Sequence, residues 1–194
     1  MQNEYYNLVE KQLRKMKAKI ESAMGDCDVL SITDVYAKMS KGRQCMVEPI
    51  IETDEEYIAR WLEEHPGSQN GYPIAKPYDT NGGEVVRTKA EKIIADELYR
   101  MGIPYRYEPK LQLDNGLVKY PDFVALNVNE RKTYWIEHFG LTNDSEYIQD
   151  NLEKLIIYER NGIVIGDNLI VTVETANYPQ NVKTLDKKIK KYLK

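Results

Sequence analysis

The sequence has little of what would mark a secreted, membrane-bound or zinc-stabilised protein. It contains only two cysteines in 194 residues, Cys27 and Cys45. Two cysteines with no second pair indicate neither a disulfide framework nor a structural zinc site, which favours a reducing, intracellular setting. No apolar run is long enough to span a membrane, and the charged N-terminus lacks the apolar centre of a signal peptide. We therefore expect a soluble, cytoplasmic protein with no membrane partner.

An excess of positive charge is also lacking. The chain carries 27 Lys and Arg against 31 Asp and Glu, a formal net charge of −4. This balance argues against a protein covered in positive potential, so a nucleic-acid partner would need a local basic patch. Neither a G-x-S-x-G motif nor a Cys–His pair in a suitable context is present, so a Ser- or Cys-based hydrolase is not indicated.

The chain does have enough apolar sequence, 42% of its residues, for one main domain with an extension. Apolar residues recur at helical spacing in the Lys-rich stretch 4–24, which predicts an amphipathic helix. A second helix is predicted over 53–64, ending at His65 and Pro66. The segment 67–83 is rich in Gly, Pro, Asn and Tyr and indicates a linker or a long ordered loop. We assign residues 1–80 to an N-terminal helical extension and linker.

The rest of the chain predicts alternating helices and strands, with a core at 81–178 and a basic C-terminal helix at 179–194. A strong hairpin signal, Asp114-Asn115-Gly116, separates the first two strands. The last strand is apolar and rich in β-branched residues, as expected of a central strand. In chain order the predicted elements are a helix ending at Gly102, strands 105–113, 117–128 and 133–138, a helix 144–160, a strand 168–174 and a helix 181–194.

Two acids fall close together in this predicted hairpin of strands. Asp122 lies at the edge of a strand that is apolar on both faces. With the 129–132 turn centred at its midpoint, antiparallel pairing would place Val124 opposite Glu137 and Asp122 one diagonal step away. Close carboxylates repel unless a cation lies between them, so the pair predicts a site for Mg²⁺ or Mn²⁺ that could activate water. Each acid also has an ordinary interpretation, Asp122 as a turn residue and Glu137 as a solvated edge-strand carboxylate.

A third acid, Glu91, lies at the margin of the apolar face of the helix that ends at Gly102. Positions 91, 94 and 98 share one helix face, so Glu91 is expected to point toward the sheet. The segment Thr88-Lys89-Ala90-Glu91 also matches a capping box, in which Glu91 would bond the backbone of Thr88. Both interpretations stay open at the level of sequence.

Three segments, VRTKAEKIIADELYRMGIPYRYE, YPDF and YWIEHFG, resemble the PD-(D/E)XK nuclease superfamily in order and interval over about residues 83–174. The resemblance implies an α/β fold with a restriction-endonuclease-like core, α-β-β-β-α-β, in which helices flank a mixed central sheet. It implies that Glu91, Asp122 and Glu137 are the three family acids. It also implies that the backbone carbonyl of His138 helps to bind the metal; a catalytic base and an ordinary core histidine are the alternatives for its ring, which strand alternation turns to the opposite face.

The family's lysine is missing, because Phe139 stands two residues after Glu137. In some members this lysine lies on the following helix, where this chain has Lys154, with Tyr158 one turn later. RecB-like relatives have Gln and Tyr at that spacing. The resemblance implies that Lys154 orients the attacking water or stabilises developing negative charge. An ordinary surface lysine is the alternative.

These observations predict a metal-dependent endonuclease or phosphodiesterase, with DNA as the first choice of substrate. We expect Arg87, Lys89 and Tyr158 to contact the nucleic acid. The alternative is an inactive nuclease fold that binds nucleic acid or protein, for example in phage–host conflict. A homodimer is also open, and residues 1–80 are candidates for substrate selection or dimerisation.

Overall fold

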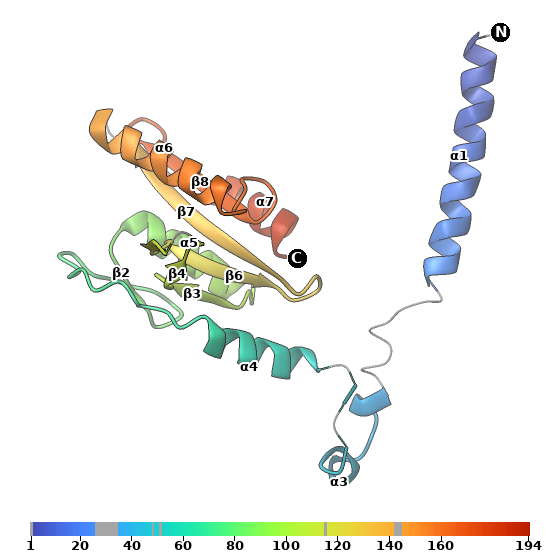
Figure 1. Ribbon diagram of the computed structural model, residues 1–194, viewed down its shortest axis with the longest axis horizontal. Helices are drawn as coiled ribbons and strands as arrows, with labels where there is room; N and C mark the ends of the chain where they lie inside the picture. Colours follow the sequence, from blue (N-terminus) through green and yellow to red (C-terminus); the bar gives the residue numbers. More distant parts are fainter. Residues whose placement is uncertain (1, 26–34, 48, 51, 115, 142–144) are drawn as a thin grey trace. The chain divides into compact units, whose positions relative to one another are not determined.

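The computed structural model describes residues 2–25, 35–47, 49–50, 52–114, 116–141 and 145–194. The chain forms two compact units, residues 1–53 and 54–194. The first unit contains the long helix α1 (Gln2–Gly25) and the short helix α3 (Lys41–Gln44) (Figure 1). The predicted helix over 4–24 is therefore confirmed. Cys45 is free and exposed, and Cys27 lies outside the described residues.

The second unit is built on a four-stranded mixed sheet with the order β3-β6-β7-β8. The first three of these strands pair antiparallel and β8 runs parallel to β7. The α/β fold class with a mixed sheet and flanking helices is thus confirmed. In chain order the elements are α4 (Asp54–Glu64), β1 (Tyr78–Asp79), β2 (Val85–Val86), α5 (Lys89–Arg100), β3 (Tyr105–Tyr107), β4 (Leu111–Gln112), β5 (Val118–Lys119), β6 (Phe123–Asn127), β7 (Lys132–Leu141), α6 (Ser145–Arg160), β8 (Leu169–Thr175) and α7 (Val182–Tyr192).

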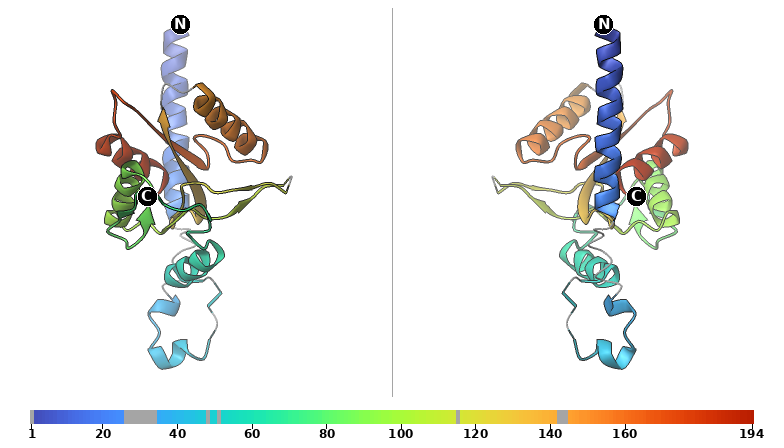
Figure 2. Two further views of the ribbon diagram at one scale, coloured as in Figure 1. Left: turned by 90° about the vertical axis from the view of Figure 1, so that its left-hand side faces the viewer. Right: turned by 90° about the vertical axis from the view of Figure 1, so that its right-hand side faces the viewer.

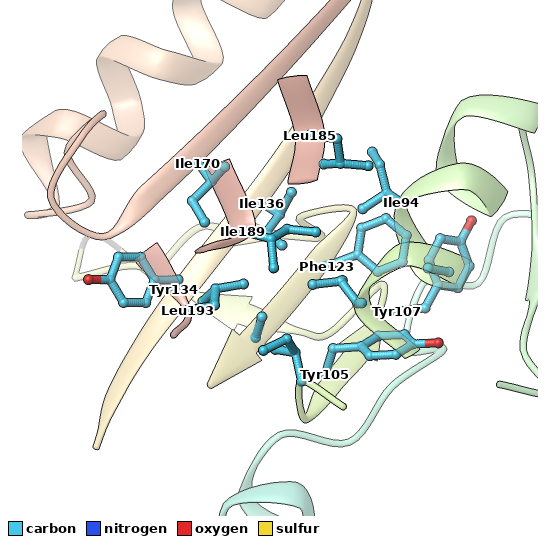
Figure 3. Close-up of a cluster of buried hydrophobic side chains, with 14 of the residues drawn as sticks. Ile94, Tyr105, Tyr107, Phe123, Tyr134, Ile136, Ile170, Leu185, Ile189 and Leu193 are labelled. Carbon is cyan, nitrogen blue, oxygen red and sulfur yellow. The ribbon is translucent and has the colours of Figure 1, made fainter. Parts of the chain in front are cut away.

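Helices cover both faces of this sheet because its strands are apolar on both sides. Figure 2 shows α5 and α7 on one face and α6 on the other. On the first face, Ile94 of α5 and Leu185 and Ile189 of α7 pack in one cluster with Phe123 and Ile136 (Figure 3). The next residues along the strands point to the opposite face, where Leu169 packs with Tyr158 of α6. Alternation thus decides which side chains can meet α6.

The predicted strands 105–113 and 117–128 are each divided in two. Tyr105 and Tyr107 pair with β6, whereas β4 and β5 form a separate two-stranded ribbon. The division follows from Glu108, whose φ of 43° lies in the left-handed region and interrupts an extended strand. The predicted hairpin signal therefore belongs to this ribbon, and its Asn115 lies outside the described residues.

The predicted central position of strand 168–174 is wrong. Strand β8 stands at the end of the sheet, next to β7. Its apolar sequence has a different cause, which is burial on both faces: Ile170 faces α7 and Leu169 faces α6. The ammonium of Lys188 in α7 donates to the carbonyl of Val171 in this strand. At the other end of the sheet, the Ser68 amide donates to the carbonyl of Tyr107 at 2.6 Å.

The boundary between the units lies after Thr53, whereas the predicted end of the extension is residue 80. Helix α4 belongs to the sheet because Trp61 is only 2% exposed and packs against Val124 and Leu126. Its indole Nε1 donates to Thr133 Oγ1 at 2.9 Å. The basic C-terminal helix is likewise part of the core, where Leu185 and Ile189 are buried together with Leu193, which follows the helix. Within the described residues, no helix has the length and apolar character needed to cross a membrane.

Candidate active site

Asp122 and Glu137 lie directly across from each other at the end of the β6–β7 pairing. Phe123 pairs with Ile136 and Val124 with Trp135, so the next position sets Asp122 opposite Glu137. The predicted register, with Val124 opposite Glu137, is wrong. The turn is centred one residue earlier than expected, since Asn127 pairs with Lys132. The Asn127 side chain accepts a hydrogen bond from the amide of Glu130 within this turn. A shift of one residue in the turn moves the register by two.

Where backbone pairing between the two strands stops, the Asp122 side chain accepts a backbone hydrogen bond from the neighbouring strand. Its Oδ2 accepts a hydrogen bond from the His138 amide at 2.6 Å. Among the described residues, no hydrogen bond to its other oxygen, Oδ1, is formed. One oxygen of this carboxylate is therefore fixed and the other is available.

Glu137 is held by two side chains from one face of α6. It is only 1% exposed, and its position on β7 puts it on the same face as Trp135, toward that helix. Tyr158 donates from its hydroxyl to Glu137 Oε1 at 2.7 Å, and Lys154 Nζ donates to Oε2 at 2.7 Å. Residues four apart on a helix share a face, which explains how both reach the same carboxylate. Lys154 thus points to the acids rather than into solvent.

Burial sets the charge state of this cluster. It raises the pKa of Glu137, an effect that the Lys154 charge opposes. It raises the pKa of Asp122 well above its ordinary value, and the nearby Glu137 charge raises it further. The pKa of Tyr158 is also raised, by burial and by Glu137, so its hydroxyl stays protonated and can only donate to that carboxylate. Of the two acids, Asp122 is therefore the one whose negative charge is less well compensated by its surroundings.

Glu91 combines the two roles that the sequence left open. Its Oε2 accepts from the amides of Arg87 at 2.9 Å and Thr88 at 3.3 Å, and the Thr88 side chain completes the capping box. The same oxygen accepts from the Tyr107 hydroxyl at 2.8 Å. Glu91 is also near enough for its charge to raise the pKa of Asp122. Within the described part of the chain, however, no three acidic, His or Cys side chains gather closely enough to hold a metal alone.

The ring of His138 turns to the sheet face opposite Glu137, as strand alternation predicted. Its Nδ1 lies 2.8 Å from Thr172 Oγ1, and its Nε2 lies 3.5 Å from Glu174 Oε1. Burial lowers the pKa of His138, which favours the neutral ring. The imidazole is therefore not positioned as a base beside the acids, and the metal-binding role of its carbonyl stays a prediction.

The three predicted nucleic-acid contacts differ in what the structure leaves accessible. The hypothesis that Tyr158 contacts nucleic acid is wrong, because its side chain is fully buried. The Arg87 guanidinium is bound internally, to Glu108 at 2.7 Å and to the carbonyls of residues 72–73, so it fixes the ordered loop. Lys89 is exposed in the first turn of α5 and stays a candidate contact.

Sequence reasoning missed Lys119 and Thr172. The positive charge of Lys119, at the end of β5, lowers the pKa of Glu137. Its signal in the sequence is a cation three residues before Asp122. Thr172 pairs with His138 across β7 and β8, and a hydroxyl within the apolar run LIVTV could have suggested a buried polar partner. Phe139, which stands where the family lysine would be, is buried.

Comparison with known proteins gives little guidance to the chemistry. No family model matches the chain, and no solved structure matches it. The chain is similar to an uncharacterized protein of Methanocaldococcus jannaschii, with 30% identity over 122 residues, or 56% of this chain. It spans 10% of the length of that relative, so the similarity concerns a small part of a much larger protein.

Proposed function

We propose that this chain is a metal-dependent nuclease with a PD-(D/E)XK-type core, which hydrolyses phosphodiester bonds in DNA. The observation that carries the proposal is the arrangement at the end of β6 and β7. There Asp122 lies opposite Glu137, and the Lys154 ammonium is 2.7 Å from the Glu137 carboxylate. The chain order helix, three antiparallel strands, helix, parallel strand is also compatible with this core.

The residues present suit a Mg²⁺ or Mn²⁺ ion. Asp122 has one oxygen without a hydrogen-bond donor among the described residues, and burial together with the nearby Glu137 charge raises its pKa. Carboxylate and carbonyl oxygens are the ligands that these hard cations prefer. Asp122, Glu137 and the carbonyl of His138 would hold the ion, with Glu91 assisting directly or through water. When bound, the ion would supply an activated water and positive charge beside the phosphate.

The side chains around the acids have separate tasks in this proposal. Lys154 has three donor hydrogens and its side chain is 23% exposed, so it can hold Glu137 and still reach a water or a phosphate oxygen. Tyr158 is a positioning residue that fixes the Glu137 carboxylate. The His138 amide fixes Asp122 in the same way. The Lys154 ammonium, held in place by Glu137, could stabilise a developing anion without rearrangement.

A nicking assay tests the proposal. The protein is incubated with supercoiled plasmid and with labelled single-stranded DNA and RNA, in Mg²⁺ and in Mn²⁺. We expect cleavage of DNA by the wild type, and a loss of about 100-fold or more in Asp122→Asn, Glu137→Gln and Lys154→Met, as for removal of a single charge-stabilising group. Glu130→Gln and Lys187→Met, at exposed positions, are the matched controls and should keep wild-type rates.

Equal cleavage by the wild type and all three site variants would contradict the proposal, because the activity would then come from elsewhere.

A second candidate function is that of an inactive nuclease fold that binds nucleic acid or protein. It is favoured by the observation that both oxygens of Glu137 already accept hydrogen bonds, together with the buried Phe139 in the lysine position. Tight DNA binding by a wild type that cleaves nothing in either metal would establish this second function.

A further inference from the structure

Helix α1 carries an apolar stripe with a seven-residue repeat. Tyr6, Val9, Leu13, Met16 and Ile20 follow one another at steps of three and four, and the next step falls on Ala23. The first five side chains are between 37% and 59% exposed although they are apolar. A repeat of this kind marks the seam of a coiled coil rather than the broader face of a helix that packs on a globular core.

We propose that this seam is a dimerisation surface and that its partner is α1 of a second copy of the chain, packed antiparallel. The seven positions of such a repeat are lettered a to g, and the seam residues occupy positions a and d. In an antiparallel pair, every residue at position a packs against a residue at position d of the partner. Tyr6, Leu13 and Ile20 are the a positions, and Val9, Met16 and Ala23 are the d positions.

One register satisfies every layer of such a pair. When Leu13 lies against Met16 of the partner, Val9 lies against Ile20, and Tyr6 against Ala23. The largest side chain of the seam then meets the smallest. The symmetry axis passes between residues 14 and 15, so each contact occurs twice, as a two-fold interface requires.

The charges beside the seam favour the antiparallel arrangement. The flanking e positions are Glu10 and Lys17, and in an antiparallel pair e positions face e positions. Glu10 therefore faces Lys17 of the partner, and the reverse contact is identical. In a parallel pair Lys17 would face the uncharged Gln12, and every layer would stack a side chain on its own copy. Flanking charges of this kind set partner and orientation in coiled coils.

Existing ion pairs on α1 do not prevent these contacts. Glu10 lies 2.6 Å from Arg14, and Lys17 lies 3.6 Å from Glu21, both as exposed pairs four residues apart. Such pairs contribute little and can rearrange or be shared with a partner. The helix of 24 residues offers three heptads, which is short for a coiled coil. We therefore expect a dimer that dissociates on dilution.

Charge reversal on the full-length protein tests the surface and its direction together. The molar mass is measured by sedimentation velocity over a wide range of concentration, and the wild type should approach twice 22.6 kDa. Glu10→Lys and Lys17→Glu each place like charges across the seam, so each variant should be monomeric where the wild type is dimeric. An equimolar mixture of the two variants restores both attractive contacts and should recover the dimer.

Glu21→Lys is the matched control, because it creates the same like-charge pair within the helix but lies outside the seam. It should dimerise as the wild type does, and circular dichroism should show equal helix content in all variants. Dimerisation of Glu10→Lys and Lys17→Glu at wild-type concentrations would overturn the antiparallel pairing. A wild type that stays monomeric at every concentration would overturn the dimer, and would indicate that the stripe packs within its own chain.

Discussion

Asp122 and Glu137 lie opposite each other, but they receive different hydrogen bonds. Glu137 receives a charged and a neutral hydrogen bond, whereas Asp122 receives one backbone amide. Burial and the Glu137 charge both raise the pKa of Asp122. The folded protein therefore holds this carboxylate at an energetic cost whenever it is ionised.

The pH dependence of stability should reveal this cost. Because the folded pKa of Asp122 lies above its unfolded value, its ionisation opposes folding: the relative stability present at low pH is lost as pH rises through the folded pKa. Asp122→Asn keeps the acceptor for the His138 amide and removes the charge. We expect it to raise the free energy of unfolding at pH 8 by about 1.4 kcal/mol or more, the equivalent of one pKa unit.

Urea unfolding followed by circular dichroism, from pH 8 down to pH 4, measures this difference, which should shrink toward acid pH. Excess Mg²⁺ should stabilise the wild type and leave Asp122→Asn unchanged. Asp150→Asn, at an exposed position of α6, is the control and should follow the wild type at every pH. A variant less stable than the wild type at pH 8 would contradict an uncompensated charge at Asp122.

At the scale of single residues, the sequence predicted which side chains lie close together better than it predicted which are exposed. Motif order and spacing indicated that Asp122, Glu137 and Lys154 would meet, and the structure brings them together. The same reasoning assigned Tyr158 and Arg87 to nucleic acid, whereas the structure buries Tyr158 and binds Arg87 to Glu108. Whether a side chain is exposed depends on how α6 and the loops pack, which spacing along the chain does not specify.

At the scale of elements, the sequence did not indicate the place of α4. Its helical pattern was predicted, but nothing in that pattern showed that Trp61 would pack on the sheet beside Val124. Long-range contacts of this kind depend on shape and on the Thr133 hydroxyl that the indole meets. Strand limits were also unpredictable, because the left-handed backbone at Glu108 divides the predicted strand 105–113.

Removal of the Trp61 side chain tests whether α4 is an integral part of the sheet unit. We expect Trp61→Ala to lower the free energy of unfolding by about 3 to 5 kcal/mol, as large-to-small changes of buried aromatic residues do. Glu63→Ala, on the exposed side of the same helix, should change it by less than about 0.5 kcal/mol. Denaturant unfolding of both variants gives the comparison. A loss below about 1 kcal/mol for Trp61→Ala would mean that α4 is dispensable for the sheet.

At the scale of the whole molecule, the excess of negative charge limits how the protein can hold DNA. With a net charge of −4, general attraction to a polyanion is absent and single exposed cations must matter.

If the proposed nuclease function holds, Lys89→Gln should weaken DNA binding in EDTA and reduce the slope of log affinity against log salt by about one. Fluorescence anisotropy across a salt series measures this slope. Lys187→Gln is the control, and an equal change in both variants would argue against a specific contact at Lys89.

The two ends of the sheet are protected unequally. The loop at Ser68 and Gln69 donates backbone hydrogen bonds to the carbonyls of Tyr107 and Glu108 beside β3. Strand β8, at the other end, is bridged by Ile165 at Leu169, and farther along the Lys188 ammonium donates to the carbonyl of Val171. An unpaired edge of apolar, β-branched residues is a template for further strands. Neutralising Lys188, by mutation or acetylation, would remove the positive charge at Val171, and we expect strand addition to begin at that part of the edge.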